Sequence, residues 1–166
     1  MADAYARTYF ANEGVYIEDG NDLPDYVDDQ LDDIPASVWT DGGDCLRGKK
    51  IDQAKKIENN LGENFPVCDT LYDGVLGSTK SYDTSRDSYS TTKGWLSKLK
   101  SDINRLDGFT EKTWNSVPIT KEMYSSKCFN IVIPNCELTE AQQAALQQAK
   151  DYAASLKIDV KVYITQ

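Results

Sequence analysis

Residues 64–83, NFPVCDTLYDGVLGSTKSYD, contain the strongest local signal in the chain. Two short apolar runs flank the Asp-Gly pair at 73–74, and such a pair is a strong signal for a two-residue hairpin turn. The turn sets the register, because paired residues point to one side of a hairpin and side chains alternate along each strand. Asp69 is therefore predicted to face Ser78, with Lys80 on the same side.

This face of the predicted hairpin gathers an acid, a hydroxyl and an amine where apolar side chains are expected. Charged groups are seldom covered unless they pair or bind a metal. The preceding residues 49–61, KKIDQAKKIENNL, are predicted to form a helix that ends at Gly62. On a helical wheel with about 100° per residue, Glu58 lies inside the apolar arc of that helix, so its side chain would point toward the hairpin. The alternative is that Glu58 lies at the edge of the arc and reaches water.

These residue types predict a particular chemistry. The chain has no histidine, which excludes Ser-His-Asp and Cys-His nucleophilic sites and His-based ribonuclease chemistry. Glu58 and Asp69 can hold one or two Mg²⁺ ions through oxygen, and such ions polarise phosphates and activate water. Lys80 can steady charge on phosphoryl oxygens, and Ser78 can hydrogen-bond beside it. The set predicts metal-assisted phosphodiester cleavage.

The rest of the chain predicts an α/β fold, a mixed β-sheet flanked by helices. A helix is expected at about 92–106, and a capping box of Thr139 and Gln142 opens another that runs to about 156. Strands are expected at 114–119, 129–133 and 158–164. The last strand–helix–strand unit should cross over to form a parallel pair.

Charge divides the chain into two expected units. Residues 1–45 hold 12 acids and one base, whereas residues 46–166 hold 15 acids and 17 bases. We expect an acidic leader at 1–45 and a functional domain at 46–166. The leader is interpreted either as a solvated, partly ordered segment, which we favour, or as an acidic strap over a basic surface.

The four cysteines and the hydropathy limit the remaining alternatives. No cysteine belongs to a C-x-x-C pair, so zinc is not expected. A disulfide between Cys128 and Cys136 is one option, and free thiols in a cytosolic protein are the favoured one. No apolar run approaches the roughly 20 residues of a membrane helix, and no signal peptide is expected at the N-terminus.

The order of these residues resembles a known superfamily. A helix acid, then Asp, eight residues and Ser-x-Lys, resembles the PD-(D/E)xK nucleases. The closest resemblance is to the C-terminal nuclease toxin domains of contact-dependent growth inhibition (CdiA-type) proteins, which share NFPV-x-D…GV…S-x-K-S-x-D. The final segment, IVIPNCELTEAQQAALQQAKDYAASLKIDVKVYI at 131–164, is similar as well. The resemblance covers about residues 46–166.

The resemblance implies roles for individual residues. Glu58 matches the helix acid, Asp69 the metal-binding aspartate and Lys80 the lysine of the third motif. Ser78 stands where the superfamily more often has an acid, so the site has one carboxylate ligand fewer than the common pattern. Glu58 and Asp69 are therefore the expected ligands of Mg²⁺ or another divalent cation.

The resemblance also implies a biology. Such domains end a large secreted or cell-surface effector, act in the cytoplasm of a target bacterium, and are blocked by a cognate immunity protein. RNA, and specifically tRNA, is the expected substrate, and DNA is the alternative because the broader superfamily mostly cuts DNA. A non-enzymatic alternative is an acidic module that binds a basic partner through residues 19–44, with Glu58 and Lys80 as ordinary surface residues.

Overall fold

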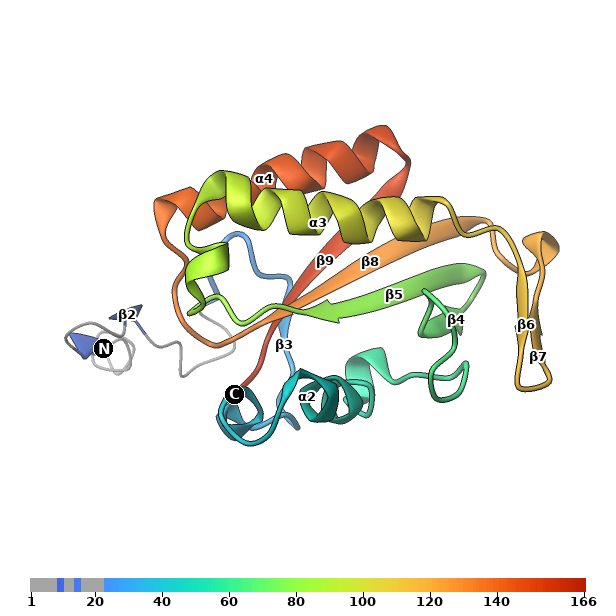
Figure 1. Cartoon of the computed structure of the whole chain (residues 1–166), viewed down its shortest axis with the longest axis horizontal. Helices are drawn as coiled ribbons and strands as arrows, with labels where there is room; N and C mark the ends of the chain where they lie inside the picture. Colours follow the sequence, from blue (N-terminus) through green and yellow to red (C-terminus); the bar gives the residue numbers. More distant parts are fainter. Residues whose placement is uncertain (1–8, 11–13, 16–22) are drawn as a thin grey trace.

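A computed structural model describes residues 9–10, 14–15 and 23–166. Within these residues the centre of the fold is a mixed sheet with the strand order β3-β9-β8-β5-β4 (Figure 1). Neighbouring strands run parallel except β4, which is antiparallel to β5. The strands are β3 Asp29–Gln30, β4 Thr70–Tyr72, β5 Val75–Ser81, β8 Ser126–Ile133 and β9 Ile158–Ile164. The predicted α/β fold with a mixed sheet is confirmed.

Helices cover both faces of this sheet. The helices α3 Thr92–Asp107 and α4 Glu140–Ser155 lie side by side over one face, and α2 Asp44–Ile51 lies on the other (Figure 1). Short 3-10 helices connect the main elements: η1 Ala36–Trp39, η2 Lys55–Ile57, η3 Asp87–Tyr89 and η4 Lys121–Met123. The arrangement produces one apolar cluster on each side of the sheet.

The two long helices form as the sequence predicts. The Thr91 side chain caps α3 by accepting from the Gly94 N–H, and Thr139 and Gln142 form the predicted capping box of α4. The helix α3 buries residues spaced three or four apart against the sheet: Trp95, Leu99, Ile103 and Leu106. The predicted parallel pair on either side of α4 is confirmed as β8 and β9.

The predicted hairpin is confirmed, with its register, for the three residue pairs next to the turn, whereas the predicted pairing of Asp69 with Ser78 lies beyond this ladder. Tyr72 pairs with Val75 across the Asp-Gly turn, and the ladder ends where Thr70 pairs with Gly77. Gly77 is required there, because a Cβ at this position would lie 2.2 Å from Thr70 Oγ1. The hairpin joins the sheet through β5, which runs parallel to β8.

The prediction of a helix at 49–61 is wrong. The helix α2 ends at Ile51, and a turn, η2 and a loop follow. Asn59 Oδ1 accepts from the backbone N–H groups of Leu61 and Gly62, while the Asn60 side chain makes two hydrogen bonds to the Leu71 backbone. Asparagine side chains that bond the backbone in this way compete with helix formation.

The prediction of a single strand at 114–119 is also wrong. Two strands, β6 Lys112–Trp114 and β7 Val117–Ile119, pair as a separate antiparallel hairpin. Asn115 and Ser116 form its turn with φ values of 46° and 64°. Two successive positive φ values match the type I′ geometry that suits a two-residue hairpin.

Part of the predicted acidic leader packs on the sheet. The strand β3 pairs with Tyr163 and Ile164 of β9, and Leu31 and Val38 are buried in the cluster under α2. Lys56 forms ion pairs with acids of this segment, at 2.9 Å to Asp29 and 3.7 Å to Asp32. Residues 1–8, 11–13 and 16–22 of the predicted leader lie outside the described residues, and Tyr9–Phe10 (β1) pairs with Gly14–Val15 (β2). The boundary at residue 45 stays a prediction.

The described residues show the state of the cysteines and the character of the helices. Among the described residues, which include every cysteine, no disulfide joins Cys128 to Cys136. In the same part of the chain, every helix is too short or too polar to cross a membrane.

Candidate active site

Asp69 lies immediately before β4, at the end of the hairpin ladder. Its N–H donates to the Gly77 carbonyl at 2.8 Å, and its carboxylate accepts from the Thr79 N–H at 2.7 Å. The pKa of Asp69 is raised to about 6, chiefly by burial and to a smaller degree by the negative charge of Asp52, while the Thr79 N–H and the charge of Lys80 oppose the rise. Asp69 is therefore a partly buried carboxylate that a cation would stabilise in its ionised form.

Lys80 lies near the end of β5 and is partly buried. Its positive charge opposes the burial-driven rise in the pKa of Asp69 and of Asp52. Lys80 is thus within electrostatic reach of both carboxylates. The three residues form a cluster of two acids and one amine that interact electrostatically near the β4–β5 edge of the sheet.

Asp52, the C-cap residue of α2, supplies the second carboxylate. Burial raises the pKa of Asp52, and a hydrogen bond with the Asn59 side chain and the charge of Lys80 oppose that rise. The residues around it are anchored in the core, with Ile51 1% and Ala54 0% exposed. The Asp52 carbonyl also accepts from the Asn59 N–H at 2.8 Å. Asp52 therefore has a defined position, within electrostatic reach of Asp69.

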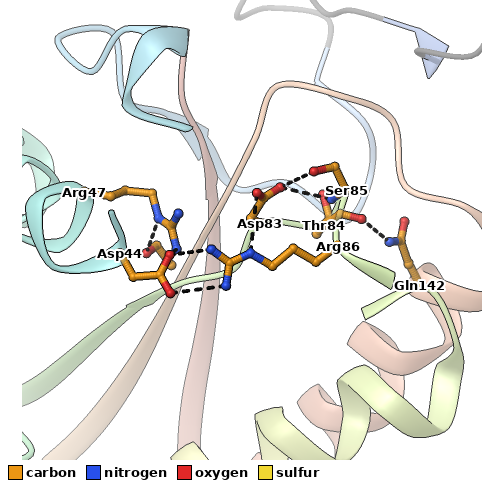
Figure 2. Close-up of polar contacts among 8 residues, drawn as sticks. Asp44, Arg47, Asp83, Thr84, Ser85, Arg86 and Gln142 are labelled. Atoms are coloured by element: carbon orange, nitrogen blue, oxygen red, sulfur yellow. Dashed lines mark hydrogen bonds and ion pairs between the residues drawn. The ribbon is translucent and has the colours of Figure 1, made fainter. Parts of the chain in front are cut away.

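A buried arginine fixes α2 against β5. Arg47 is 6% exposed, and its Nε donates to Ser81 Oγ at 3.1 Å, one residue after Lys80. Figure 2 shows Arg47 and Arg86 meeting at Asp44, with Arg86 coming from the loop after β5. Because Asp52 directly follows the helix that carries Arg47, this anchor also sets where Asp52 lies relative to Lys80.

The structure places the other two predicted site residues differently. Glu58 is exposed in the loop after η2, where its carbonyl accepts from the Tyr72 hydroxyl at 2.7 Å. The expected approach of Glu58 along a buried helix face does not occur, because no helix extends to residue 58. Ser78 is only 1% exposed and lies in the packed interior. The structure brings together Asp69 and Lys80 and adds Asp52.

Sequence reasoning missed Asp52 because it extended α2 through residues 49–61. On that longer helix Asp52 was not on the apolar arc, and Glu58 was. The signal that could have corrected this is the Asn pair at 59–60, since asparagine is a poor helix former that favours turns and caps. A break before these residues leaves Asp52 at a helix end, next to the buried Ile51.

The backbone leading into Asp69 is strained. Val67, two residues earlier, has φ of 70°. A β-branched residue with positive φ is a genuine outlier, and such strain costs roughly 1–3 kcal/mol. Strained residues of this kind cluster at functional sites, which agrees with the position of Asp69.

The two carboxylates of the cluster suit the expected divalent cation. In residues 23–166, Asp52 and Asp69 are the acids of the cluster, and no group of three or more Cys, Asp and Glu is arranged to hold a metal. Mg²⁺ commonly binds through one or two carboxylates and keeps several waters. Asp52 and Asp69 repel each other, as the effect of Asp52 on the pKa of Asp69 indicates. Two neighbouring carboxylates fit a hard cation.

Comparison with known proteins identifies the family. Residues 47–163 match the CDI toxin restriction endonuclease-like domain. The chain belongs to this family. Asp52, Asp69 and Lys80 all lie within the matched part of this CDI toxin domain. The restriction endonuclease-like fold expected from the resemblance is thereby confirmed, and the chain is a toxin domain of interbacterial competition.

A solved structure shares the fold of this CDI toxin domain. A chain of the CdiA-CT/CdiI toxin and immunity complex from Yersinia pseudotuberculosis superposes with a TM-score of 0.59 at 22% identity. The similarity covers 71% of this chain and 97% of that chain. A comparison with curated proteins gave no match.

Proposed function

We propose that this CDI toxin domain is a metal-dependent nuclease that cleaves RNA, with tRNA as its substrate. The observation that carries the proposal is the cluster of Asp52, Asp69 and Lys80 at the edge of a restriction endonuclease-like sheet. Two acids and one amine are the groups that phosphodiester hydrolysis needs in a chain without histidine.

Each residue of the cluster has a distinct role in this proposal. Asp52 and Asp69 would hold Mg²⁺ or another divalent cation, and the Thr79 N–H fixes the Asp69 carboxylate by hydrogen bonding. When bound, such a cation would supply polarisation of the phosphate and activation of a water molecule. Lys80 stabilises the negative charge that develops on the phosphoryl oxygens. Ser78 and Glu58, which the sequence also suggested, have no role in this version of the site.

The preference for RNA rests on charge and on the resemblance of the sequence to tRNA-cleaving toxins. Residues 46–166 hold 17 bases against 15 acids, a weak net charge for a protein that follows a long duplex. A small folded RNA needs fewer phosphate contacts. DNA remains the alternative substrate, and the assay below separates the two.

The biological setting follows from family membership. We infer that the domain is delivered into target bacteria as part of a larger surface effector and acts in their cytoplasm. We also infer that a dedicated immunity protein binds this domain, since the solved toxin from Yersinia pseudotuberculosis is part of a toxin and immunity complex.

Digestion of nucleic acid tests the proposal directly. Total tRNA and plasmid DNA are each incubated with the domain in Mg²⁺ or in EDTA, and the products are end-mapped. We expect cleavage of tRNA in Mg²⁺, none in EDTA, and an intact plasmid. Adding the protein encoded directly downstream should stop the cleavage if it is the immunity protein. A plasmid that is cut while tRNA survives would establish the DNase alternative, and loss of neither substrate would favour a binding module.

The raised pKa of Asp69 predicts how stability depends on pH. The folded value of about 6 exceeds the ordinary 3.8, so the folded state binds more protons than the unfolded chain between about pH 4 and 6. The free energy of unfolding in EDTA should therefore fall as the pH rises through this window. Asp69→Asn should flatten the dependence, whereas Glu58→Gln, a change at an exposed acid, should not. Denaturant titrations from pH 4 to 7 measure this, and equal slopes for wild type and Asp69→Asn would contradict it.

A further inference from the structure

The loop after η2 lies along the open edge of the sheet. The strand β4 is the last strand of the sheet in the described part of the chain, so its outer backbone groups face no further strand. The Asn60 side chain bonds to them at Leu71. Its Nδ2 donates to the Leu71 carbonyl at 2.8 Å, and its Oδ1 accepts from the Leu71 N–H at 2.8 Å. One side-chain amide thereby ties the loop to β4 as a neighbouring strand would.

The same loop bonds to the backbone of both proposed metal ligands. The Asn59 N–H donates to the Asp52 carbonyl at 2.8 Å, and the Asn60 N–H donates to the Asp69 carbonyl at 3.2 Å. Because consecutive residues of a chain are about 3.8 Å apart, these two bonds place the carbonyl oxygens of Asp52 and Asp69 within about 10 Å of each other. Asn59 and Asn60 therefore connect the end of α2 to the start of β4.

The side chain of Asn59 fixes the conformation of this connection. Its Oδ1 accepts from the backbone N–H groups of Leu61 and Gly62 at 2.9 Å and 3.1 Å, which holds the chain in a turn after Asn59. The Asn59 side chain also hydrogen-bonds to Asp52, and its Nδ2 is the donor because only this atom of the amide carries hydrogens. Asn59 therefore contacts both the backbone and the side chain of Asp52.

We propose that Asn59 and Asn60 are positioning residues that set where Asp52 lies relative to Asp69 for the binding of one divalent cation. Groups that hydrogen-bond to a metal ligand fix its orientation, and their loss typically weakens metal binding by about 10-fold to 100-fold. Mg²⁺ tolerates little departure from its preferred geometry, so a shift of α2 against β4 would weaken its binding. The inference rests on the proposed function, which makes Asp52 and Asp69 the metal ligands.

Metal binding measured without cleavage tests this role. Mn²⁺ is the probe, because it prefers the same oxygen ligands as Mg²⁺ and its electron paramagnetic resonance signal gives the concentration of the free ion. We expect the wild type to bind Mn²⁺ and Asp52→Asn to lose this binding. Asn60→Ala removes both bonds to Leu71 and should weaken Mn²⁺ binding by about 10-fold, and Asn59→Ala should weaken it by a similar factor.

Thr139→Ala is the matched control for a loss of stability. Thr139 caps α4, which lies on the other face of the sheet from α2. Its substitution should lower the thermal midpoint Tm in EDTA and leave the dissociation constant for Mn²⁺ unchanged, when binding is measured well below the Tm. A purely structural role for Asn60 would give the same pattern in Asn60→Ala, namely a lower Tm and wild-type affinity.

Tyr72→Phe extends the test to a variant that keeps its aromatic ring. The Tyr72 hydroxyl donates to the Glu58 carbonyl at 2.7 Å and so ties the same loop to β4. Tyr72 is 49% exposed, so the substitution should leave the fold intact. We expect a several-fold weaker affinity for Mn²⁺, and this variant decides the question if neither asparagine variant folds.

The possible results separate this inference from the proposed function. Wild-type affinity for Mn²⁺ in the folded loop variants, together with lost binding in Asp52→Asn, would overturn the positioning role and leave the metal site in place. A wild type that does not bind Mn²⁺ would overturn both. If the loop variants weaken Mn²⁺ binding as expected but the wild type cleaves neither tRNA nor plasmid, the nuclease proposal fails and the positioning role stands.

Discussion

Asp69→Asn and Lys80→Ala are each expected to reduce RNA cleavage by at least about 100-fold while the domain stays folded. Asp69 supplies one of only two carboxylates in the cluster, and an amide is a poor ligand for a hard cation. Lys80 supplies the positive charge near the phosphoryl oxygens, and removing one such stabilising group typically costs 10²–10³ in rate.

The fold should survive both changes for identifiable reasons. The side-chain amide oxygen that Asp69→Asn introduces can still accept from the Thr79 N–H, and the substitution removes the cost of ionising a partly buried acid. We expect the Tm of Asp69→Asn at neutral pH to equal or exceed that of wild type in EDTA. Single-turnover cleavage of tRNA measures the rate, and Lys112→Ala, at an exposed lysine of β6, is the control for Lys80→Ala. Cleavage at the wild-type rate by either variant would show that the substituted residue does not belong to the active site.

The second large effect should separate Asp52 from Glu58. Asp52→Asn is expected to reduce cleavage by about 100-fold or more, whereas Glu58→Gln should cleave within about 2-fold of wild type. Asp52 is close enough to raise the pKa of Asp69, and Glu58 is exposed in a loop. Both substitutions replace a carboxylate by an amide of the same shape, so each is a control for the other.

Stabilisation by the metal gives a readout for this pair that does not depend on turnover. A cation that binds only the folded state raises the Tm according to its concentration and affinity. Addition of Mg²⁺ should raise the Tm of wild type and of Glu58→Gln, and should have a much smaller effect on Asp52→Asn. The reverse result, in which Mg²⁺ does not raise the Tm of Glu58→Gln, would support Glu58 as the metal ligand, as the sequence pattern suggested.

Much of the scaffold was predictable because its signals are local. The Asp-Gly turn sets the hairpin register within a few residues, and Thr139 with Gln142 begins α4. The alternating apolar residues of 158–164 predict β9 without reference to anything distant. The same local register placed Asp69 and Lys80 on one hairpin, so two of the three residues of the candidate cluster could be identified from the sequence.

The acid opposite that hairpin could not be identified in the same way. A helical wheel gives Glu58 the buried position only if the helix continues, and local propensity alone did not end it at Ile51. The break is stabilised by contacts across the fold, in which Asn60 bonds to Leu71 of β4 and Asn59 bonds to Asp52. Arg47 then fixes α2 on Ser81, which lies 34 residues later in the chain.

Local sequence signals account for the turn of the hairpin, the two capped helices and the central strands, and they place Asp69 and Lys80 on one hairpin. Only the packed fold shows which acid joins them. Asp52 acquires its burial and its electrostatic partners from strands and loops far away in the chain, so these properties exist only after those segments have packed together.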